Sequence, residues 1–192
     1  MRLLLLGAPG AGKGTQGARL ASTLAIRHIA TGDVLRAEVE SNSETGRRAA
    51  RYLRCGELVP DDLIIDALMP ALVAAAGRGG YILDGFPRTA AQARELDAIG
   101  ARLNIPLERA VYIDVPQHAL RQRLLARAEL EGRSDDTPDI ITRRLQIFAA
   151  TTRPVIERYR QLGILVTVDG SDSVDEITNE ILDRLSERSG AR

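Results

Sequence analysis

The stretch RLLLLGAPGAGKGTQ, from Arg2 to Gln16, decides the fold of this chain. Its first residues, Arg2 to Leu6, are a short apolar run that ends at glycines, which is typical of a buried parallel strand. The residues that follow Lys13, from Thr15 to Leu24, have the apolar spacing of a helix. A strand, a G-x-x-x-x-G-K loop and a helix in this order predict a P-loop, in which backbone N–H groups and the helix N-terminus bind phosphate.

Lys13 is the single lysine of the chain. The chain has 26 lysine and arginine residues, and all the others are arginine. An ammonium group is a compact point charge on a flexible stem, whereas a guanidinium is a planar fork. The compact group fits inside a tight backbone loop, so we expect Lys13 to reach the β- and γ-phosphates of a nucleotide. The general motif has Ser or Thr directly after the lysine, but here Gly14 comes between Lys13 and Thr15.

The composition limits the classes of protein to consider. A length of 192 residues suits one α/β domain with small inserted lobes. The net charge is zero and aromatic residues are 3% of the chain, which argues against binding to nucleic acid or a membrane surface. One cysteine, Cys55, excludes an internal disulfide and a cysteine-cluster metal site. No apolar stretch approaches the 18 residues of a membrane span, so we expect a cytoplasmic protein.

Apolar runs alternate with segments of helical length along the chain. We expect strands at Leu3–Leu6, Arg27–Ala30, Tyr81–Asp84, Ala110–Asp114 and Leu165–Val168. Segments between them, such as 61–76 and 90–103, have helical apolar spacing. Helix starts are marked at Thr137, which precedes a proline, and at Ser173, which begins a capping box. The alternation predicts an α/β fold with three layers: a five-stranded parallel sheet with helices on both faces.

Five segments together resemble the adenylate kinase family in its short-lid form. They are GAPGAGKGTQ (7–16), TGDVLR (31–36), GELVPDD (56–62), DGFPRTAAQ (84–92) and R-x5-R-x-D-D (127–136). The resemblance extends from residue 1 to about residue 185, with the segments in family order and at family spacing. It implies a single P-loop kinase domain at 1–192, an AMP-binding lobe at 30–59 and a short lid over ATP at 126–137.

The resemblance also implies an activity and its partners. The expected reaction is Mg-ATP + AMP ⇌ 2 ADP, catalysed by a monomer with ATP, AMP and ADP as its ligands. The longer lids of this family can carry a zinc site, but this lid lacks both the length and the cysteines, so we predict no structural zinc. Mg²⁺ is expected to bind mainly to nucleotide phosphates and water.

Three sets of residues follow from the same resemblance. The expected catalytic residues are Lys13, Asp84, Arg88, Arg133 and Arg144. The expected ATP-binding residues are Gly10, Ala11, Gly12, Lys13, Gly14, Thr15, Arg127 and Asp172. The expected AMP-binding residues are Thr31, Arg36, Glu57, Leu58, Val59, Gly85, Phe86, Pro87, Arg88, Gln92, Arg133 and Arg144. Guanidinium forks suit these positions because they bind phosphate bidentately. Glu57 departs from the pattern, because the family often has a basic residue there.

Several of these residues have a second interpretation. Asp84 either orients water bound to Mg²⁺, with no direct protein–metal bond, or forms a turn with its own backbone. Gln92 either reads the adenine edge of AMP or completes a capping box with Thr89. Thr31 is a helix N-cap, an AMP contact, or both. His28 and His118 have no partner at a suggestive spacing, so we assign neither a catalytic role.

Two rival functions are open at this point. A UMP/CMP kinase has the same phosphoryl-transfer chemistry, but tends to have Asn at the position of Thr89 and lacks the Gln92 signature. Thr89 and Gln92 therefore favour AMP as the acceptor. A nucleotide-binding scaffold without turnover is more remote, because it predicts loss of the catalytic arginines and all five motif arginines are present here.

Overall fold

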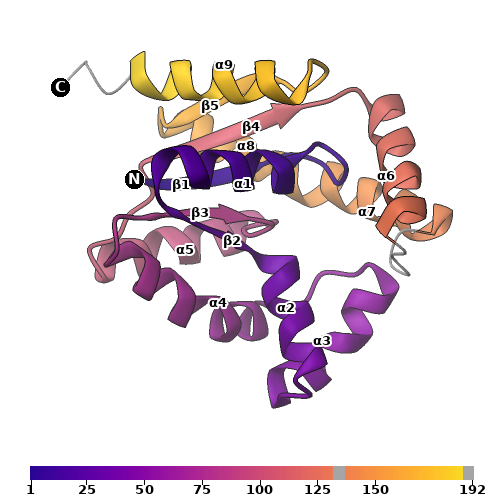
Figure 1. The fold of residues 1–192 in the computed structure, drawn as a ribbon. Helices are drawn as coiled ribbons and strands as arrows, with labels where there is room; N and C mark the ends of the chain where they lie inside the picture. Colours follow the sequence, from indigo (N-terminus) through magenta and orange to yellow (C-terminus); the bar gives the residue numbers. More distant parts are fainter. Residues whose placement is uncertain (132–136, 188–192) are drawn as a thin grey trace.

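The computed structural model describes residues 1–131 and 137–187. At its centre is a five-stranded sheet in the order β2-β3-β1-β4-β5, in which every pair of neighbours is parallel (Figure 1). The strands are β1 (Arg2–Leu6), β2 (Arg27–Ala30), β3 (Tyr81–Asp84), β4 (Arg109–Asp114) and β5 (Leu165–Asp169). The predicted strands and the predicted parallel sheet are confirmed, with ends that differ by at most one residue.

Helices connect the strands. They are α1 (Lys13–Leu24), α2 (Thr31–Glu40), α3 (Glu44–Cys55), α4 (Asp61–Ala76), α5 (Ala90–Arg102), α6 (Gln117–Glu131), α7 (Pro138–Ile147), the π-helix η1 (Phe148–Thr152), α8 (Arg153–Gln161) and α9 (Val174–Glu187). The predicted cap at Thr137 is confirmed, since its side chain accepts a hydrogen bond from the N–H of Ile140. The capping box is also confirmed: the N–H of Ser173 donates to Glu176 at 3.0 Å and the N–H of Glu176 donates to the Ser173 hydroxyl at 3.3 Å.

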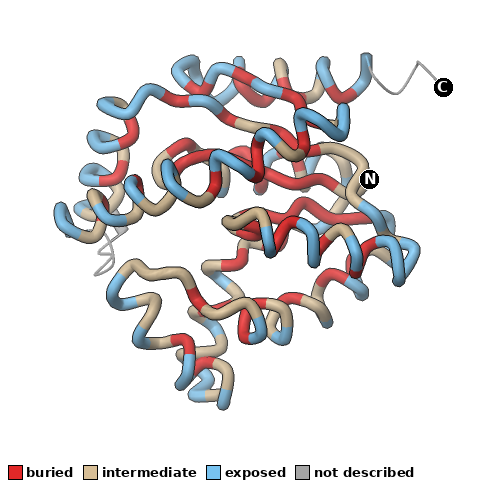
Figure 2. The backbone as a smooth tube through the Cα atoms, turned by 180° about the vertical axis from the view of Figure 1, so that it is seen from behind, coloured by how far each residue is buried: buried red, intermediate tan, exposed pale blue. Residues whose placement is uncertain are grey.

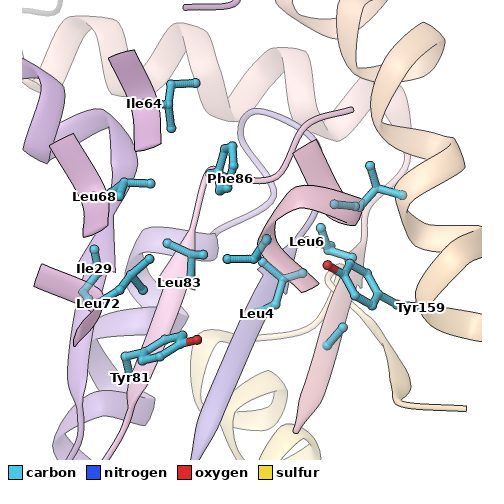
Figure 3. Close-up of a cluster of buried hydrophobic side chains, with 14 of the residues drawn as sticks. Leu4, Leu6, Ile29, Ile64, Leu68, Leu72, Tyr81, Leu83, Phe86 and Tyr159 are labelled. Carbon is cyan, nitrogen blue, oxygen red and sulfur yellow. The ribbon is translucent and has the colours of Figure 1, made fainter. Parts of the chain in front are cut away.

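The core has two layers, one on each face of the sheet. Because successive side chains of a strand point to opposite faces, Leu4 and Leu6 of β1 belong to one cluster, and Leu3 and Leu5 belong to the other. The first cluster includes residues of α4, α5 and α8, and Figure 3 shows Leu4, Leu83 and Phe86 within it. The second includes residues of α1, α6, α7 and α9. The three-layer prediction is therefore confirmed.

Burial follows these layers. Figure 2 shows buried residues along the strands and on the helix faces that turn toward them. The helices α2 and α3 extend beyond this body next to α4 (Figure 1), and they bury few side chains. This polar segment is helical, as the sequence predicts. None of the helices in the described ranges is both long and apolar enough to cross a membrane.

Candidate functional site

The glycine-rich loop joins the end of β1 to the start of α1. Gly10 and Gly12 have φ values of 84° and 89°, in the left-handed region that favours glycine. A Cβ on Gly10 would also lie 2.9 Å from the carbonyl oxygen of Leu120, so this position tolerates no side chain. Gly12 is the N-cap of α1, and the first N–H groups of that helix have no partner within the helix. The loop and the helix start therefore have the backbone geometry of an anion-binding site.

Lys13 lies inside this loop. Its Nζ donates to the carbonyl oxygen of Gly7 at 2.9 Å and to that of Ala8 at 3.1 Å. Both acceptors are backbone groups of the loop itself. The loop therefore holds the ammonium group at the strand end through neutral acceptors, and a phosphate oxygen offers it a stronger, charged partner.

The electrostatic environment of Lys13 is strongly cationic. Its pKa is lowered from 10.5 to about 8, chiefly by burial; the charge of Asp84 opposes this shift and neighbouring positive charges add to it. The positive charges that act on Lys13 are those of Arg88, Arg144 and Arg127. Like charges gathered around a desolvated ammonium destabilise the free protein and favour the binding of an anion. The sequence predicted these four cations for one site, and the structure brings them within reach of one another.

Asp84 supplies the acidic group of this site. The parallel register pairs it with Leu5 of β1, which places it beside the strand that enters the loop. Asp84 is buried, and its Oδ2 lies 3.8 Å from Nε2 of His28 on β2. Within the described part of the chain, that buried Nε2 has no hydrogen-bond partner. No sequence pattern predicts this contact, because it arises from the pairing of β2 with β3.

Thr31 is not the N-cap of its helix, which is one of the roles that the sequence predicts for it. The N-cap of α2 is Ala30, and Thr31 is the first residue of the helix. Its hydroxyl is buried and donates to the carbonyl oxygen of Asp84 at 2.8 Å. The N-cap interpretation is therefore wrong: the nearby end of β3 offers the hydroxyl an acceptor, so Thr31 links α2 to β3.

Arg88 follows β3 and is held by its neighbours. Its Nε donates to the carbonyl oxygen of Gly85 at 2.7 Å, and its own carbonyl accepts from the hydroxyl of Thr152 at 2.9 Å. Gly85 has a φ of 87°, and Thr152 is buried at the end of η1. Burial and the charge of Arg144 lower the pKa of Arg88. The guanidinium is thus fixed near a second arginine, an arrangement that suits a shared anion.

Gln92 is occupied by local contacts. Its Oε1 accepts from the backbone N–H of Arg88 at 2.6 Å and of Thr89 at 3.3 Å, and the predicted capping box is confirmed. Its Nε2 donates to Asp61 of α4 at 2.6 Å. The side chain is fully buried. An adenine contact would therefore require the amide to exchange some of these partners.

The end of the segment 30–59 lies against α7. Gly56 has a φ of 64°, and a Cβ there would lie 2.7 Å from Cγ2 of Ile140, so the backbone approaches α7 closely. The next residue, Glu57, pairs with Arg143 at 2.6 Å. Arg144 follows Arg143 and lines the cavity described below. Two adjacent arginines of α7 thus have separate environments.

A cavity of about 950 Å³ brings most of the predicted residues together. The predicted residues that line it are Gly10, Ala11, Gly12, Lys13, Gly14, Thr15, Arg36, Glu57, Asp84, Gly85, Arg88, Arg127, Arg144 and Asp172. A second cavity of about 70 Å³ shares Lys13, Gly85, Arg88 and Arg144, and Leu58 and Pro87 also line it.

Four of the described predicted residues line neither cavity. Val59 and Phe86 belong to the hydrophobic core, and Thr31 and Gln92 are buried polar residues. Arg133 lies outside the described residues.

Arg123 also lines the large cavity, and the sequence interpretation missed it. The available signal was its spacing: it precedes Arg127 by four residues on α6, which places both on one helix face.

The described ranges contain no cluster of three or more His, Cys, Asp or Glu side chains that could hold a metal ion. Asp84 is the buried carboxylate that lies next to the glycine-rich loop. One carboxylate near a phosphate site fits Mg²⁺, which commonly keeps several waters and binds through substrate phosphates.

Comparisons with known proteins agree with this geometry. The family model described as "Adenylate kinase" matches residues 5–164. An adenylate kinase of Xanthomonas campestris pv. campestris is 46% identical over 181 residues, which cover 94% of this chain and 97% of the relative. One of Xylella fastidiosa is 46% identical and one of Stenotrophomonas maltophilia is 44% identical, each over 182 residues, with 95% of this chain and 97% of the relative covered.

Proposed function

The chain belongs to the adenylate kinase family and transfers a phosphoryl group reversibly between ATP and AMP, and we propose that the residues around Lys13 carry out this transfer. One observation supports the proposed site most strongly. Lys13 and the three arginines whose charges act on it, Arg88, Arg127 and Arg144, line one cavity together with the buried carboxylate of Asp84. Lys13 and Arg88 are desolvated, and this concentration of positive charge favours a highly anionic ligand.

Two nucleotides supply that charge. A phosphate monoester alone carries about −1.5 to −2 charges near pH 7. In the proposal the triphosphate of ATP occupies the glycine-rich loop and the phosphate of AMP faces it, between Arg88 and Arg144. The small cavity that these two arginines share with Lys13 supports this arrangement, because it brings all three cations next to one space.

The chemistry needs no general base. An oxygen of the AMP phosphate is already ionised and attacks the γ-phosphorus of ATP, while the bond from that phosphorus to the β-phosphate oxygen breaks and ADP leaves. Lys13 and the two arginines neutralise the oxygens of the transferred group and hold attacking and leaving oxygens in line. Arg133 and Arg127 are assigned to the same ring of charges by the family pattern, and Arg36 to the AMP phosphate.

Mg²⁺ is part of the proposal. When bound to ATP it would supply further positive charge to the phosphate oxygens. Asp84 would hold it through water, and its buried position beside the loop supports that assignment. His28 lines the same cavity, with its Nε2 3.8 Å from Oδ2 of Asp84. We also propose, on the family resemblance, that residues 30–59 act as the AMP-binding lobe, that 126–137 act as the lid, and that the enzyme is a cytoplasmic monomer.

The acceptor nucleotide is tested directly by a coupled assay. The family match supports AMP over UMP or CMP. We expect ADP formation with AMP and at least about tenfold lower kcat/KM with UMP, CMP or GMP, because a site built for one base edge rejects others. Comparable rates with UMP or CMP would contradict the assignment of AMP as the acceptor. If none of AMP, UMP, CMP and GMP were phosphorylated, the proposed phosphoryl transfer would be wrong.

A further inference from the structure

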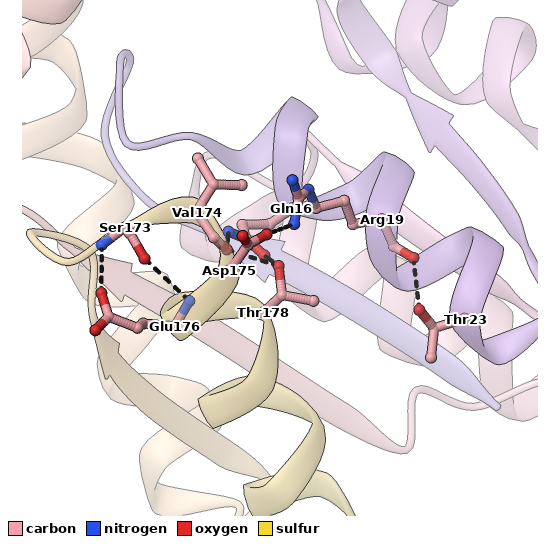
Figure 4. A network of polar contacts seen from close by, with 8 residues as sticks. All are labelled: Gln16, Arg19, Thr23, Ser173, Val174, Asp175, Glu176 and Thr178. Carbon is pink, nitrogen blue, oxygen red and sulfur yellow. Dashed lines mark hydrogen bonds and ion pairs between the residues drawn. The ribbon is translucent and has the colours of Figure 1, made fainter.

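A buried hydrogen-bond network joins α1 to α9, two helices at opposite ends of the chain (Figure 4). Nε2 of Gln16 donates to the carbonyl oxygen of Val174 at 2.9 Å. The hydroxyl of Thr178 lies 2.8 Å from both Oε1 of Gln16 and the carbonyl oxygen of Val174, and it shares its proton between them. Gln16 and Thr178 are only 2% and 7% exposed. Buried polar groups that are mutually satisfied in this way fix a single relative position of the elements that carry them.

The network lies directly behind two parts of the cavity wall. Gln16 follows the glycine-rich loop, which is called the phosphate loop below, and Val174 begins α9. Both residues line the 950 Å³ cavity. Val174 is 41% exposed, and Ile177, three residues further along α9, lines the same cavity. The exposed apolar surface of Val174 suits the face of a nucleotide base, whereas Ile177 is only 5% exposed. The phosphate site and this apolar surface are therefore connected through one amide and one hydroxyl.

The segment before α9, residues 170–173, is anchored at both ends. The N–H of Gly170 donates to the carbonyl oxygen of Asp114 at the end of β4, at 2.7 Å. At the other end, Ser173 and Glu176 form the capping box of α9. Asp172, between these anchors, lines the cavity. The position of the segment relative to the phosphate loop then depends on what holds the start of α9 to α1.

The ion pair of Arg19 with Asp175 also links α1 to α9. Both of its side chains are exposed, at 46% and 76%, and an exposed pair contributes little to the relative position of two helices. The contacts of Gln16 and Thr178 are buried, so the loss of the Thr178 hydroxyl leaves Oε1 of Gln16 without its donor.

We propose that Gln16 and Thr178 are positioning residues for the donor nucleotide: they fix the wall formed by 170–174 and Ile177 at the distance from the phosphate loop that a nucleoside triphosphate requires. The inference rests on the proposed function, in which the donor triphosphate binds at the loop. It predicts that loss of the network weakens the binding of ligands that contact both the phosphate loop and the wall formed by 170–174 and Ile177. A ligand that reaches the phosphate loop alone is insensitive to it.

The test compares ATP with inorganic tripolyphosphate in the full-length protein. Thr178→Val removes the hydroxyl with little change of shape and leaves Oε1 of Gln16 without its donor. We expect the Kd for ATP to rise about five- to tenfold and the Kd for tripolyphosphate to change less than about twofold. The KM for AMP stays unchanged. Gln16→Met removes the amide from the other side and is expected to give the same ATP-selective loss, so the test does not depend on one variant folding.

Two controls separate positioning from loss of stability. Thr178→Ser keeps the hydroxyl and is expected to restore ATP binding to within about twofold of the natural chain. Leu185→Ala removes a buried side chain, 3% exposed, from the same helix two turns further on, and is expected to destabilise the protein without weakening ATP binding.

Equal weakening of ATP and tripolyphosphate in Thr178→Val, unchanged ATP binding, or the same ATP-selective loss in Leu185→Ala would overturn the inference. If the natural chain bound neither ligand, the proposed donor site would itself be wrong. That result is distinguishable because it appears before any substitution is made.

Discussion

Nζ of Lys13 lies 2.9 Å from the carbonyl oxygen of Gly7, so the loop that is built to bind phosphate supplies the lysine with neutral acceptors of its own. The ammonium group is held inside the loop, where burial, with a smaller contribution from neighbouring arginines, lowers its pKa. A phosphate chain replaces weak acceptors with charged ones at this point. Because of this exchange, we expect the substitution of Lys13 to cause the largest loss of activity.

Lys13→Met is expected to lower kcat/KM by at least about 10²-fold, because it removes a cation aimed at the transferred group. Lys13→Arg is the matched charge control and is expected to restore little activity, since the planar fork does not fit inside the loop. A coupled assay of ADP formation measures both variants, with circular dichroism to confirm folding. Near-normal ADP formation by a folded Lys13→Met protein would refute the role of this lysine.

The same substitution predicts a pH dependence of stability. The pKa of Lys13 is about 8 in the folded protein and 10.5 in the unfolded chain, so between these values the unfolded chain binds more protons. The free energy of unfolding of the natural chain, relative to that of Lys13→Met, therefore rises from about pH 8 towards pH 10.5. Below pH 8 the variant is more stable than the natural chain by the largest amount.

Urea denaturation of both proteins from pH 7 to 10 measures this difference. Burial raises the pKa of Tyr81 to about 12, which destabilises both proteins equally above pH 10 and cancels in the comparison. A difference in free energy of unfolding that is flat with pH would show that Lys13 is not desolvated as described.

Adjacent arginines of α7 are expected to differ sharply. Arg144 lines the cavity beside Lys13, whereas Arg143 pairs with Glu57, and both members of that pair are about half exposed. Arg144→Met is expected to reduce kcat about 10²-fold or more. Arg143→Met removes the same charge from the next position and is expected to change kcat less than about threefold, because exposed ion pairs contribute about 0–1 kcal/mol. Similar losses in the two variants would mean that bulk charge, and not position, is responsible.

Gln92→Leu tests whether a buried capping residue also reads a base. We expect the KM for AMP to rise about tenfold while the KM for ATP is unchanged, because the amide offers both a donor and an acceptor to adenine. The control is Thr89→Ala, which breaks the capping box, in which the Thr89 side chain accepts from the N–H of Gln92 at 3.2 Å, but keeps the amide. An unchanged AMP dependence in Gln92→Leu, or the same rise in Thr89→Ala, would assign Gln92 to helix capping alone.

The sequence predicted the sheet well because its signals are local. Each strand is a short apolar run bounded by glycine or polar residues, as at Tyr81–Asp84, and Thr137 and Ser173 mark their helix starts through their own side chains. The glycines of the P-loop are equally local, since left-handed backbone angles at Gly10 and Gly12 require them.

The remaining features depend on contacts between distant segments. The π-helix at Phe148–Thr152 places the hydroxyl of Thr152 where it donates to the carbonyl oxygen of Arg88. No sequence pattern near either residue predicts this hydrogen bond. His28 meets Asp84 only because β2 pairs with β3, and Thr31 bonds across to β3 instead of capping its own helix. Gln16 belongs to the P-loop motif, yet its partner Thr178 lies 162 residues further along the chain.

Binding of a bisubstrate mimic tests the central claim most directly, because two adenosines joined through five phosphates would fill the donor and acceptor sites at once. Titration calorimetry with the purified, folded protein is expected to give one molecule bound per chain, tighter than ATP or AMP alone, with affinity that falls strongly in Lys13→Met and in Arg144→Met. If the mimic fails to bind, or binds no more tightly than ATP, the two nucleotides do not meet end to end at Lys13 and the proposed site is wrong.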